Sequence, residues 1–386
     1  MIVKVLGFTV GFVLSSTVFS ASPVPTLHRD GKYWVESIQG SEPAIPGGRL
    51  RVTTTGNVVW RGQEGGDIKY TLIRRVQARS ETEARSLLKA SNLVHSRSGR
   101  TVHLIAPSLV GNSDLRISGP RGLHHLFLST PGGSIDAADL DGSLSVENGA
   151  GKIAIQRVAG DVDIRSAGGA TSLNSIGGRV SVMSAGGGID VGSILGAATF
   201  QTGGGDIVVQ QVGGMVQAFT GGGEIRIIQA GDAVFARTAG GPIEIERALG
   251  LVTARNAGGP IRVGAATGVH CESDSGTIRL TNISGSMRAS TAAGSIVAEF
   301  LSGRPVVESV LSTGSGDITV FIPSNVGVTV HAQNNGSGNP RAIVSDYSAI
   351  RARTTGFALV ADGKVNGGGP LLSLAGSGGR IFIKRK

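Results

Sequence analysis

Acidic side chains cluster early in this sequence, and a pair of carboxyl groups is what acid–base cleavage of a polysaccharide requires. The cluster consists of Asp136, Asp139, Asp141, Glu147, Asp161 and Asp163. A working pair must flank one glycosidic bond, ~5–10 Å apart. The alternating pattern around these residues instead places Asp136 and Asp163 on different faces, with Ala154 one repeat above Asp136. We therefore expect no glycoside-cleaving site here.

The seven histidines lack the spacing of metal ligands. They are His28, His95, His103, His124, His125, His270 and His331. No His-Glu-x-x-His motif is present. His124 and His125 are adjacent in an expected strand, so they point to opposite sides and cannot chelate one ion. A Ser–His–Asp hydrolase is not expected either, because no Gly-x-Ser-x-Gly segment joins a strand to a helix.

The glycine-rich segments do not match calcium or phosphate sites. Calcium-binding nonapeptide repeats carry Asp at the sixth position of Gly-Gly-x-Gly-x-Asp. Here that position holds Val191, Val209 or Ile227. A phosphate-binding loop needs Gly-Lys-Ser/Thr at the start of a helix. Gly151-Lys152-Ile153 lacks the hydroxyl and precedes a strand. We predict that the protein has no metal, no cofactor and no catalytic residues.

What the glycines do predict is a stack of repeats. Glycine pairs followed by alternating apolar residues recur every 18 residues, and weaker copies fall midway between them. We assign as structural turn glycines Gly187, Gly205, Gly223, Gly241 and Gly259. Alternation directs a core ladder inward, made of Ile189, Ile207, Ile225, Ile243 and Ile261. One repeat cannot bury its own apolar face, so the repeats must stack.

The fold class is therefore all-β, a parallel β-solenoid of nine-residue strand–turn units with about 18 residues per turn and a small mixed α/β N-terminal cap. Bulky and lighter inward pairs alternate, which favours two facing parallel sheets. A three-sided coil of 27 residues and an antiparallel meander fit the pattern less well. The span from 133 to 303 predicts about nine turns, or a rod of roughly 45 Å at ~4.8 Å per turn.

Four segments are expected along the chain. Residues 1–20 read as a secretory signal peptide, with Lys4 before an apolar run and cleavage ahead of Ala21. Residues 21–113 form an N-terminal module of strands and one helix, which begins at the capping box Ser80–Glu83. The repeats occupy 114–316. Residues 317–386 supply two closing strands, at 317–321 and 380–384, separated by a loop around Asn334.

The single cysteine and the net charge of +9 both have structural explanations. One residue is missing near Gly268, so Cys271 aligns with the inward Ala254 and is expected to be buried and inert. The net charge is +7 over residues 28–121, −4 over 122–316 and +5 over 317–386, with Lys4 supplying the rest. The repeats thus offer no basic stripe with aromatics, and we expect no nucleic-acid partner.

The outward positions of the bulky strands form a row that we take as a contact face. Its members are Asp190, Arg226, Glu244, Arg262 and Arg279. Their charges have mixed signs, so they could also pair with one another between coils. Rows of Thr or of Tyr and Trp, which would indicate ice or sugar binding, do not occur. The residue types of this row therefore do not indicate a particular ligand.

Together these motifs resemble a large family of exported bacterial adhesin-like proteins with glycine-rich β-strand repeats, a domain of unknown function sometimes called toastrack-like. The resemblance rests on the Glu-rich helix near Glu81, on repeats such as Gly160-Asp161-Val162-Asp163-Ile164, and on the closing Gly363–Gly369 and Gly379–Ile383 segments. It implies an exported protein of the periplasm, cell surface or extracellular space, with no transmembrane segment after leader cleavage. The family has no agreed catalytic residues.

The function we expect is a non-catalytic surface or envelope binding scaffold, adhesin-like by resemblance. Its partner would be an envelope or extracellular polysaccharide or a cell-surface protein. Two alternatives stay open. One is an envelope-stress regulatory component that binds protein partners, and the other is a polysaccharide-active β-helix enzyme.

Overall fold

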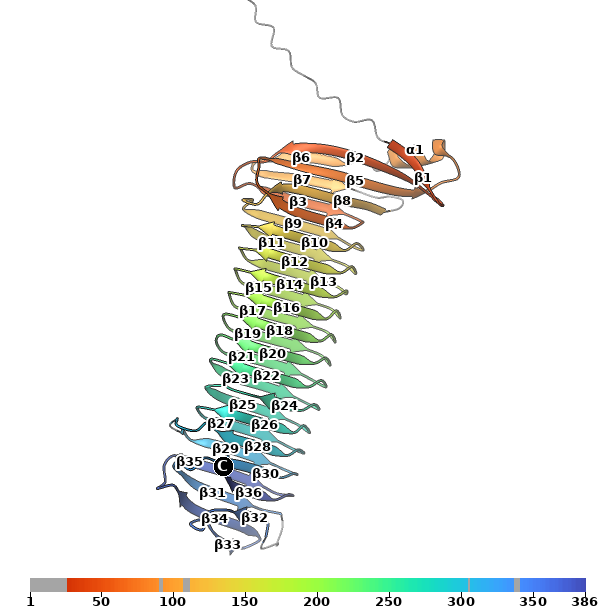
Figure 1. The fold of residues 1–386 in the computed structure, drawn as a ribbon. Helices are drawn as coiled ribbons and strands as arrows, with labels where there is room; N and C mark the ends of the chain where they lie inside the picture. Colours follow the sequence, from red (N-terminus) through yellow and green to blue (C-terminus); the bar gives the residue numbers. More distant parts are fainter. Residues whose placement is uncertain (1–25, 90–92, 107–111, 305, 337–340) are drawn as a thin grey trace, which may run out of the picture.

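The computed structural model describes residues 26–89, 93–106, 112–304, 306–336 and 341–386. The expected signal peptide lies outside the described residues. Within them the chain forms 36 strands and one helix. The strands build two long sheets that stack into a rod with the N-terminal strands at one end and the C-terminal strands at the other (Figure 1). The predicted two-sheet parallel β-solenoid is confirmed.

Sheet A contains 18 strands. In spatial order they are β1 (Thr26–Asp30), β2 (Tyr33–Pro43), β5 (Asp67–Gln77), β8 (Asn112–Pro120), β4 (Val58–Gln63), β10 (Ile135–Leu140), β12 (Ile153–Val158), β14 (Thr171–Ile176), β16 (Ile189–Ile194), β18 (Ile207–Val212), β20 (Ile225–Ala230), β22 (Ile243–Ala248), β24 (Ile261–Val263), β26 (Ile278–Ile283), β28 (Ile296–Phe300), β30 (Ile318–Ile322), β36 (Ile381–Arg385) and β32 (Ile343–Ser345).

Sheet B lies opposite and is equally long. Its spatial order is β6 (Val94–Ser98), β7 (Thr101–Ala106), β3 (Arg49–Thr54), β9 (His125–Thr130), β11 (Ser143–Asn148), β13 (Val162–Ser166), β15 (Val180–Ser184), β17 (Ala198–Thr202), β19 (Val216–Thr220), β21 (Val234–Thr238), β23 (Leu251–Asn256), β25 (Gly268–Ser273), β27 (Met287–Thr291), β29 (Ser309–Thr313), β35 (Leu371–Gly376), β31 (Val328–Asn334), β34 (Ala358–Val365) and β33 (Arg351–Thr355).

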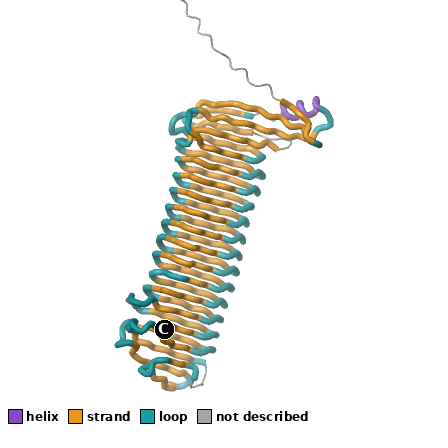
Figure 2. The backbone as a smooth tube through the Cα atoms, viewed as in Figure 1, coloured by secondary structure: helices purple, strands orange, loops and turns teal. Residues whose placement is uncertain are grey.

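One coil is a sheet-A strand, a turn, a sheet-B strand and a second turn, and each coil lies directly on the one before it (Figure 2). Parallel register pairs residues 18 positions apart, for example Ile207 with Ile225 and Ile225 with Ile243. The inward side chains of both sheets merge into one hydrophobic core that runs from Leu50 to Ile383. All five isoleucines of the predicted ladder are at most 1% exposed.

The N-terminal strands are part of these sheets rather than a separate layer. β3 lies between β7 and β9 in sheet B, and β4 lies between β8 and β10 in sheet A, all in parallel register. The coil made by residues 49–63 is thus inserted between two coils that come later in the chain. Neither sheet is interrupted at the expected 113/114 boundary.

The helix α1 (Glu81–Lys89) begins where the capping box predicts. The Ser80 hydroxyl accepts a hydrogen bond from the backbone N–H of Glu83 at 3.2 Å. The Glu83 carboxylate reaches back to the N–H of Arg79 at 2.8 Å, one residue before the box predicts. Ala84 and Leu88 pack on Val76 of β5, which fixes the helix to the N-terminal end of the rod.

The C-terminal segment is more elaborate than predicted. Instead of two strands and a loop it contributes β30 to β36. β35 and β36 continue the parallel stack, whereas β31, β34 and β33 pair antiparallel and end sheet B. The expected loop residue Asn334 is the last residue of β31 and is 1% exposed. A segment without the 18-residue period gives no register signal, so these pairings could not be read from the sequence.

Cys271 lies in the core, as predicted. It pairs in register with Ala254, is fully buried, and burial raises the pKa of its thiol to about 12. Because the thiolate is the reactive form, we expect the folded protein to resist maleimide labelling for hours, while protein unfolded in guanidinium labels within minutes. Mass spectrometry after timed labelling measures this. Equal rates in the two states would contradict the burial of this residue.

Candidate functional site

The predicted contact face lies on the outer side of sheet A. Three of its five charged side chains form ion pairs with one another. Asp190, Arg226, Glu244, Arg262 and Arg279 line up across neighbouring strands. Glu244 binds both flanking arginines, with a carboxylate oxygen 3.4 Å from Arg226 and the other 2.6 Å from Arg262. Such exposed pairs contribute little to stability, about 0–1 kcal/mol each, but they leave few free charges for a ligand.

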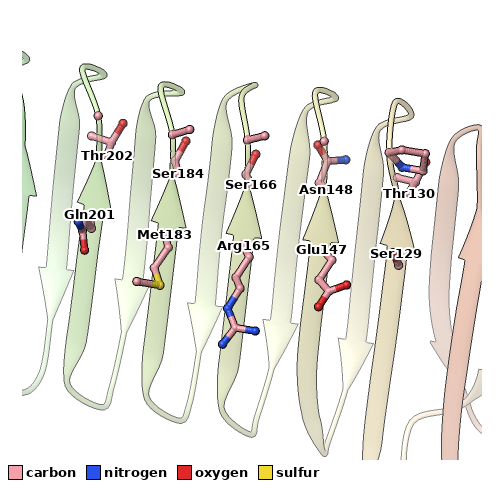
Figure 3. Close-up of a pocket in the computed structure, with 15 residues that line it drawn as sticks. Ser129, Thr130, Glu147, Asn148, Arg165, Ser166, Met183, Ser184, Gln201 and Thr202 are labelled. Atoms are coloured by element: carbon pink, nitrogen blue, oxygen red, sulfur yellow. The ribbon is translucent and has the colours of Figure 1, made fainter.

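A long recess of the described part lies instead on sheet B. Two depressions of about 710 and 1020 Å³ share Gln201, Thr202 and Gly203 and so form one channel, which we call the sheet-B groove. The groove follows the ends of the sheet-B strands from β9 to β27, over ten coils. Figure 3 shows its first half, with side chains from successive strands standing side by side along the stack.

Three parallel rows of residues build the groove. The wall is the last outward-facing position of each strand, from Ser129 through Gln201 to Ser290. The next residue in each strand points inward and is polar, from Thr130 to Thr291. The first residue of each turn forms the floor, from Pro131 to Ala292. Every floor residue is Pro, Gly or Ala except Asp274. These small side chains leave the floor below the larger side chains of the wall.

The buried polar row explains why the turns stack so evenly. The Thr220 hydroxyl donates to the carbonyl of Gly205 in the preceding coil at 2.8 Å and accepts from the N–H of Gly223 in its own turn at 3.2 Å. Thr202 and Thr238 make the same donor bonds to Gly187 and Gly223. Each turn is thereby tied to its neighbour. This row was not predicted from the sequence, although a Ser, Thr or Asn recurs before the glycines with the period of the coils.

The charges in the groove cancel. Arg165, Arg237 and Arg255 face Glu147, Glu272 and Asp274. The Glu272 carboxylate contacts two side chains, with Arg255 Nε at 2.9 Å and His270 Nε2 at 2.9 Å. The groove is therefore close to neutral along its length and does not select ligands by charge.

The acidic cluster is divided between the two sheets, and only Asp161 and Asp163 line a common recess. Asp136 lies in β10 of sheet A, where its carboxylate is 3.0 Å from Arg61 Nη1. Asp163 lies in β13 of sheet B, on the opposite side of the coil, as the alternation predicts. Asp139 accepts two hydrogen bonds from Arg157, at 2.7 and 2.9 Å, which lower the pKa of its carboxyl. An ionised, arginine-bound carboxylate is a poor proton donor.

One further row, on the C-terminal part of sheet B, has the residue types of a hydrolase triad. Ser373, His331 and Asp362 occupy facing positions on β35, β31 and β34. His331 Nδ1 lies 2.6 Å from Asp362 Oδ1, and this bond lowers the pKa of the Asp362 carboxyl. Among the described residues the Ser373 hydroxyl has no hydrogen bond to His331, and none of the recesses contains the three. The row is an exposed ion pair beside a serine, without a substrate cleft.

No group of three or more His, Cys, Asp and Glu side chains in the described part of the chain is placed to hold a metal ion. No helix within the described ranges has the length and apolarity needed to cross a membrane.

The comparisons with known proteins give only distant structural likenesses. No family model matches the sequence, and no curated protein matches it. Among solved structures, a candidate cell adhesion protein from Clostridium sporogenes is 10% identical, with 91% of this chain and 100% of that chain covered and a TM-score of 0.18. A candidate lipid-binding protein from Parabacteroides distasonis is 12% identical, with 74% and 96% covered and a TM-score of 0.30. A candidate adhesin from Bacteroides fragilis is 13% identical, with 91% and 97% covered and a TM-score of 0.21.

Proposed function

We propose that this protein is a non-catalytic binding scaffold that holds an extended polysaccharide in the sheet-B groove, acting at the cell envelope or surface as an exported adhesin-like protein. The observation that supports this most directly is the uniform groove over ten coils. Because each coil adds one wall residue, one buried polar residue and one floor residue at the same place, the groove offers a linear polymer a contact in every coil. Weak contacts in series add up to useful avidity.

The chemistry of the groove fits a neutral or sparsely charged glycan. Its wall contains hydrogen-bonding side chains such as Gln201 and Ser290 together with the apolar Met183 and Phe219. Sugars combine hydroxyl groups with apolar C–H faces, so a mixed surface of this kind suits them. A glycosidase would need two carboxyls that converge on one bond, and Asp136 and Asp163 lie on opposite sheets.

The groove floor offers a direct test. Ala185 and Ala239 are exposed floor residues, and a Trp at either would fill the channel. Ala159 is equally exposed but lies in the turn on the other side of the coil, so Ala159→Trp is the matched control. We expect wild type and the control to be retained on at least one polysaccharide of an envelope and extracellular panel. Ala185→Trp and Ala239→Trp should lose roughly tenfold or more in affinity.

Release of new sugar ends is to be measured in the same tubes. Retention without new ends supports a binding scaffold. New ends that appear with wild type would contradict it and direct attention to the region from Asp136 to Asp163. Retention that is equally strong in both groove variants would show that the ligand binds elsewhere and would refute the groove as its site.

A further inference from the structure

A cluster of cations occupies the N-terminal end of the same sheet-B face. Arg49 and Arg51 are exposed on β3, which lies between β7 and β9 near one end of the rod (Figure 1). In register, Arg49 faces His125 of β9, and Arg51 faces His103 of β7 on one side and Phe127 of β9 on the other. We call Arg49, Arg51, His103, His125 and Phe127 the basic patch.

No carboxylate balances this patch from its own strands. The four strands β6, β7, β3 and β9 contain no Asp or Glu at all. Neither Arg49 nor Arg51 forms an ion pair with any described residue. The one ion pair of β6 joins His95 to Glu42 at 2.7 Å, but His95 pairs in register with the core residue Leu104 and therefore points away from the patch. This distinguishes the patch from sheet A, where Glu244 binds two arginines.

The patch is also ordered by its own contacts. The Arg51 guanidinium lies over the Phe127 ring, 4.0 Å from its centroid. A guanidinium stacked in this way keeps its edge N–H groups free, and their fork geometry matches carboxylate, phosphate or sulfate oxygens. Burial, Arg49 and His124 together lower the pKa of His125, as expected where positive charge is not compensated.

The patch and the groove are continuous. Phe127 and Ser129 are both outward-facing positions of β9, and Ser129 is the first wall residue of the sheet-B groove. On β3 the position in register with Ser129 is Thr53, and Arg51 and Arg49 lie two and four residues before it on the same outward face. A polymer that leaves the groove past β9 therefore reaches Arg51 and then Arg49 by turning along β3. The charges of the groove cancel along its length, whereas those of the patch do not. Only the patch can distinguish an acidic polymer from a neutral one.

We infer that the basic patch binds an acidic group, a carboxylate, sulfate or phosphate, carried by a polysaccharide that lies in the sheet-B groove. The inference rests on the proposed function and adds to it the chemical class of the ligand. When the polymer is bound, its acidic group offsets the repulsion between the cations of the basic patch. Charge-assisted contacts of this kind weaken as salt rises.

The test uses the full chain in affinity electrophoresis through gels that contain alginate, an acidic glycan, or dextran, a neutral one. The test variant is Arg49→Gln/Arg51→Gln. The control is Arg116→Gln/Arg247→Gln, which removes the same charge from exposed positions of sheet A. Arg49→Gln alone is a second variant that keeps the Arg51–Phe127 contact, and thermal melting verifies that each variant folds.

We expect wild type and the control to bind alginate with equal affinity, more weakly at high salt, and the double patch variant to bind it roughly tenfold more weakly or worse. Equal alginate binding by patch variant and control would overturn the inference. Dextran binding as tight as alginate binding would also overturn it, yet leave the proposed function intact. Binding of neither glycan would overturn the inference, whereas the proposed function fails only if no polysaccharide of the panel retains the protein. Oligothymidylate bound as tightly through the same arginines would refute the assignment to a glycan.

Discussion

Replacing Gly205 with alanine should destabilise the protein by about 3 kcal/mol or more, whereas the same change at Gly204, one residue earlier, should be neutral or slightly stabilising. A methyl group on Gly205 would lie 2.5 Å from the carbonyl oxygen of Gly187 in the preceding coil and 2.7 Å from the backbone nitrogen of Gly188. Backbone atoms of a stacked coil cannot move aside without disturbing the register. At Gly204 a methyl group would meet nothing within 4 Å.

Denaturant unfolding followed by circular dichroism measures the difference. Gly204→Ala is the matched control, because it adds the same methyl group in the same turn and reduces the entropy of the unfolded chain equally. Similar free energies of unfolding for the two variants would mean that the coils are not packed as closely as the structure has them.

The glycine pattern predicts where the turns lie, but it does not predict why a glycine is required at a given position. The period located the turn glycines Gly187, Gly205, Gly223, Gly241 and Gly259, where a glycine can serve either a positive φ angle or the close approach of neighbouring coils. None of the five has a positive φ. Close approach of neighbouring coils is therefore what excludes a side chain. Glycine type alone does not tell these two causes apart, because both produce the same residue in the sequence.

The repeat predicted the two sheets and their register, since an inward ladder with a fixed period admits few stacking arrangements. It did not predict the third inward residue of the sheet-A strands. Val158, Ile176, Val212 and Ala248 are each buried after two exposed positions, whether the residue before them has a positive φ, as Arg157 and Ser175 do, or not. The strands therefore bend after their second inward residue. A prediction from strict alternation of inward and outward side chains does not include such a bend.

The groove and the basic patch could not be read from the sequence for a different reason. The groove depends on the low profile of turn residues such as Ala185 beside upright wall residues such as Gln201, and this appears only once the coil cross-section is known. The patch depends on β3 lying next to β9, although Arg49 and His125 are far apart in the chain. The charge count located excess positive charge in residues 28–121 but not the surface that carries it.

Replacing Ile225 with aspartate should cost roughly 4 kcal/mol or more and disrupt several coils around β20. Ile225 is fully buried between Ile207 and Ile243 in sheet A. An aspartate there loses the packing of the isoleucine and places a carboxylate in a core that offers it no cation. In a repeat protein each coil is stabilised by its neighbours, so a defect in the middle of the stack weakens coils on both sides.

Val208→Asp is the matched control, because Val208 is a β-branched residue one position away from the ladder residue Ile207 and faces outward. It lies between Asp190 and Arg226, and we expect its replacement to change the free energy of unfolding by less than about 1 kcal/mol. Chemical denaturation of both variants measures the two effects side by side. Since strand side chains alternate, a shift of one residue would exchange the roles of the two positions. A stable Ile225→Asp variant beside an unstable Val208→Asp variant would therefore mean that the opposite face of each sheet-A strand packs into the solenoid core.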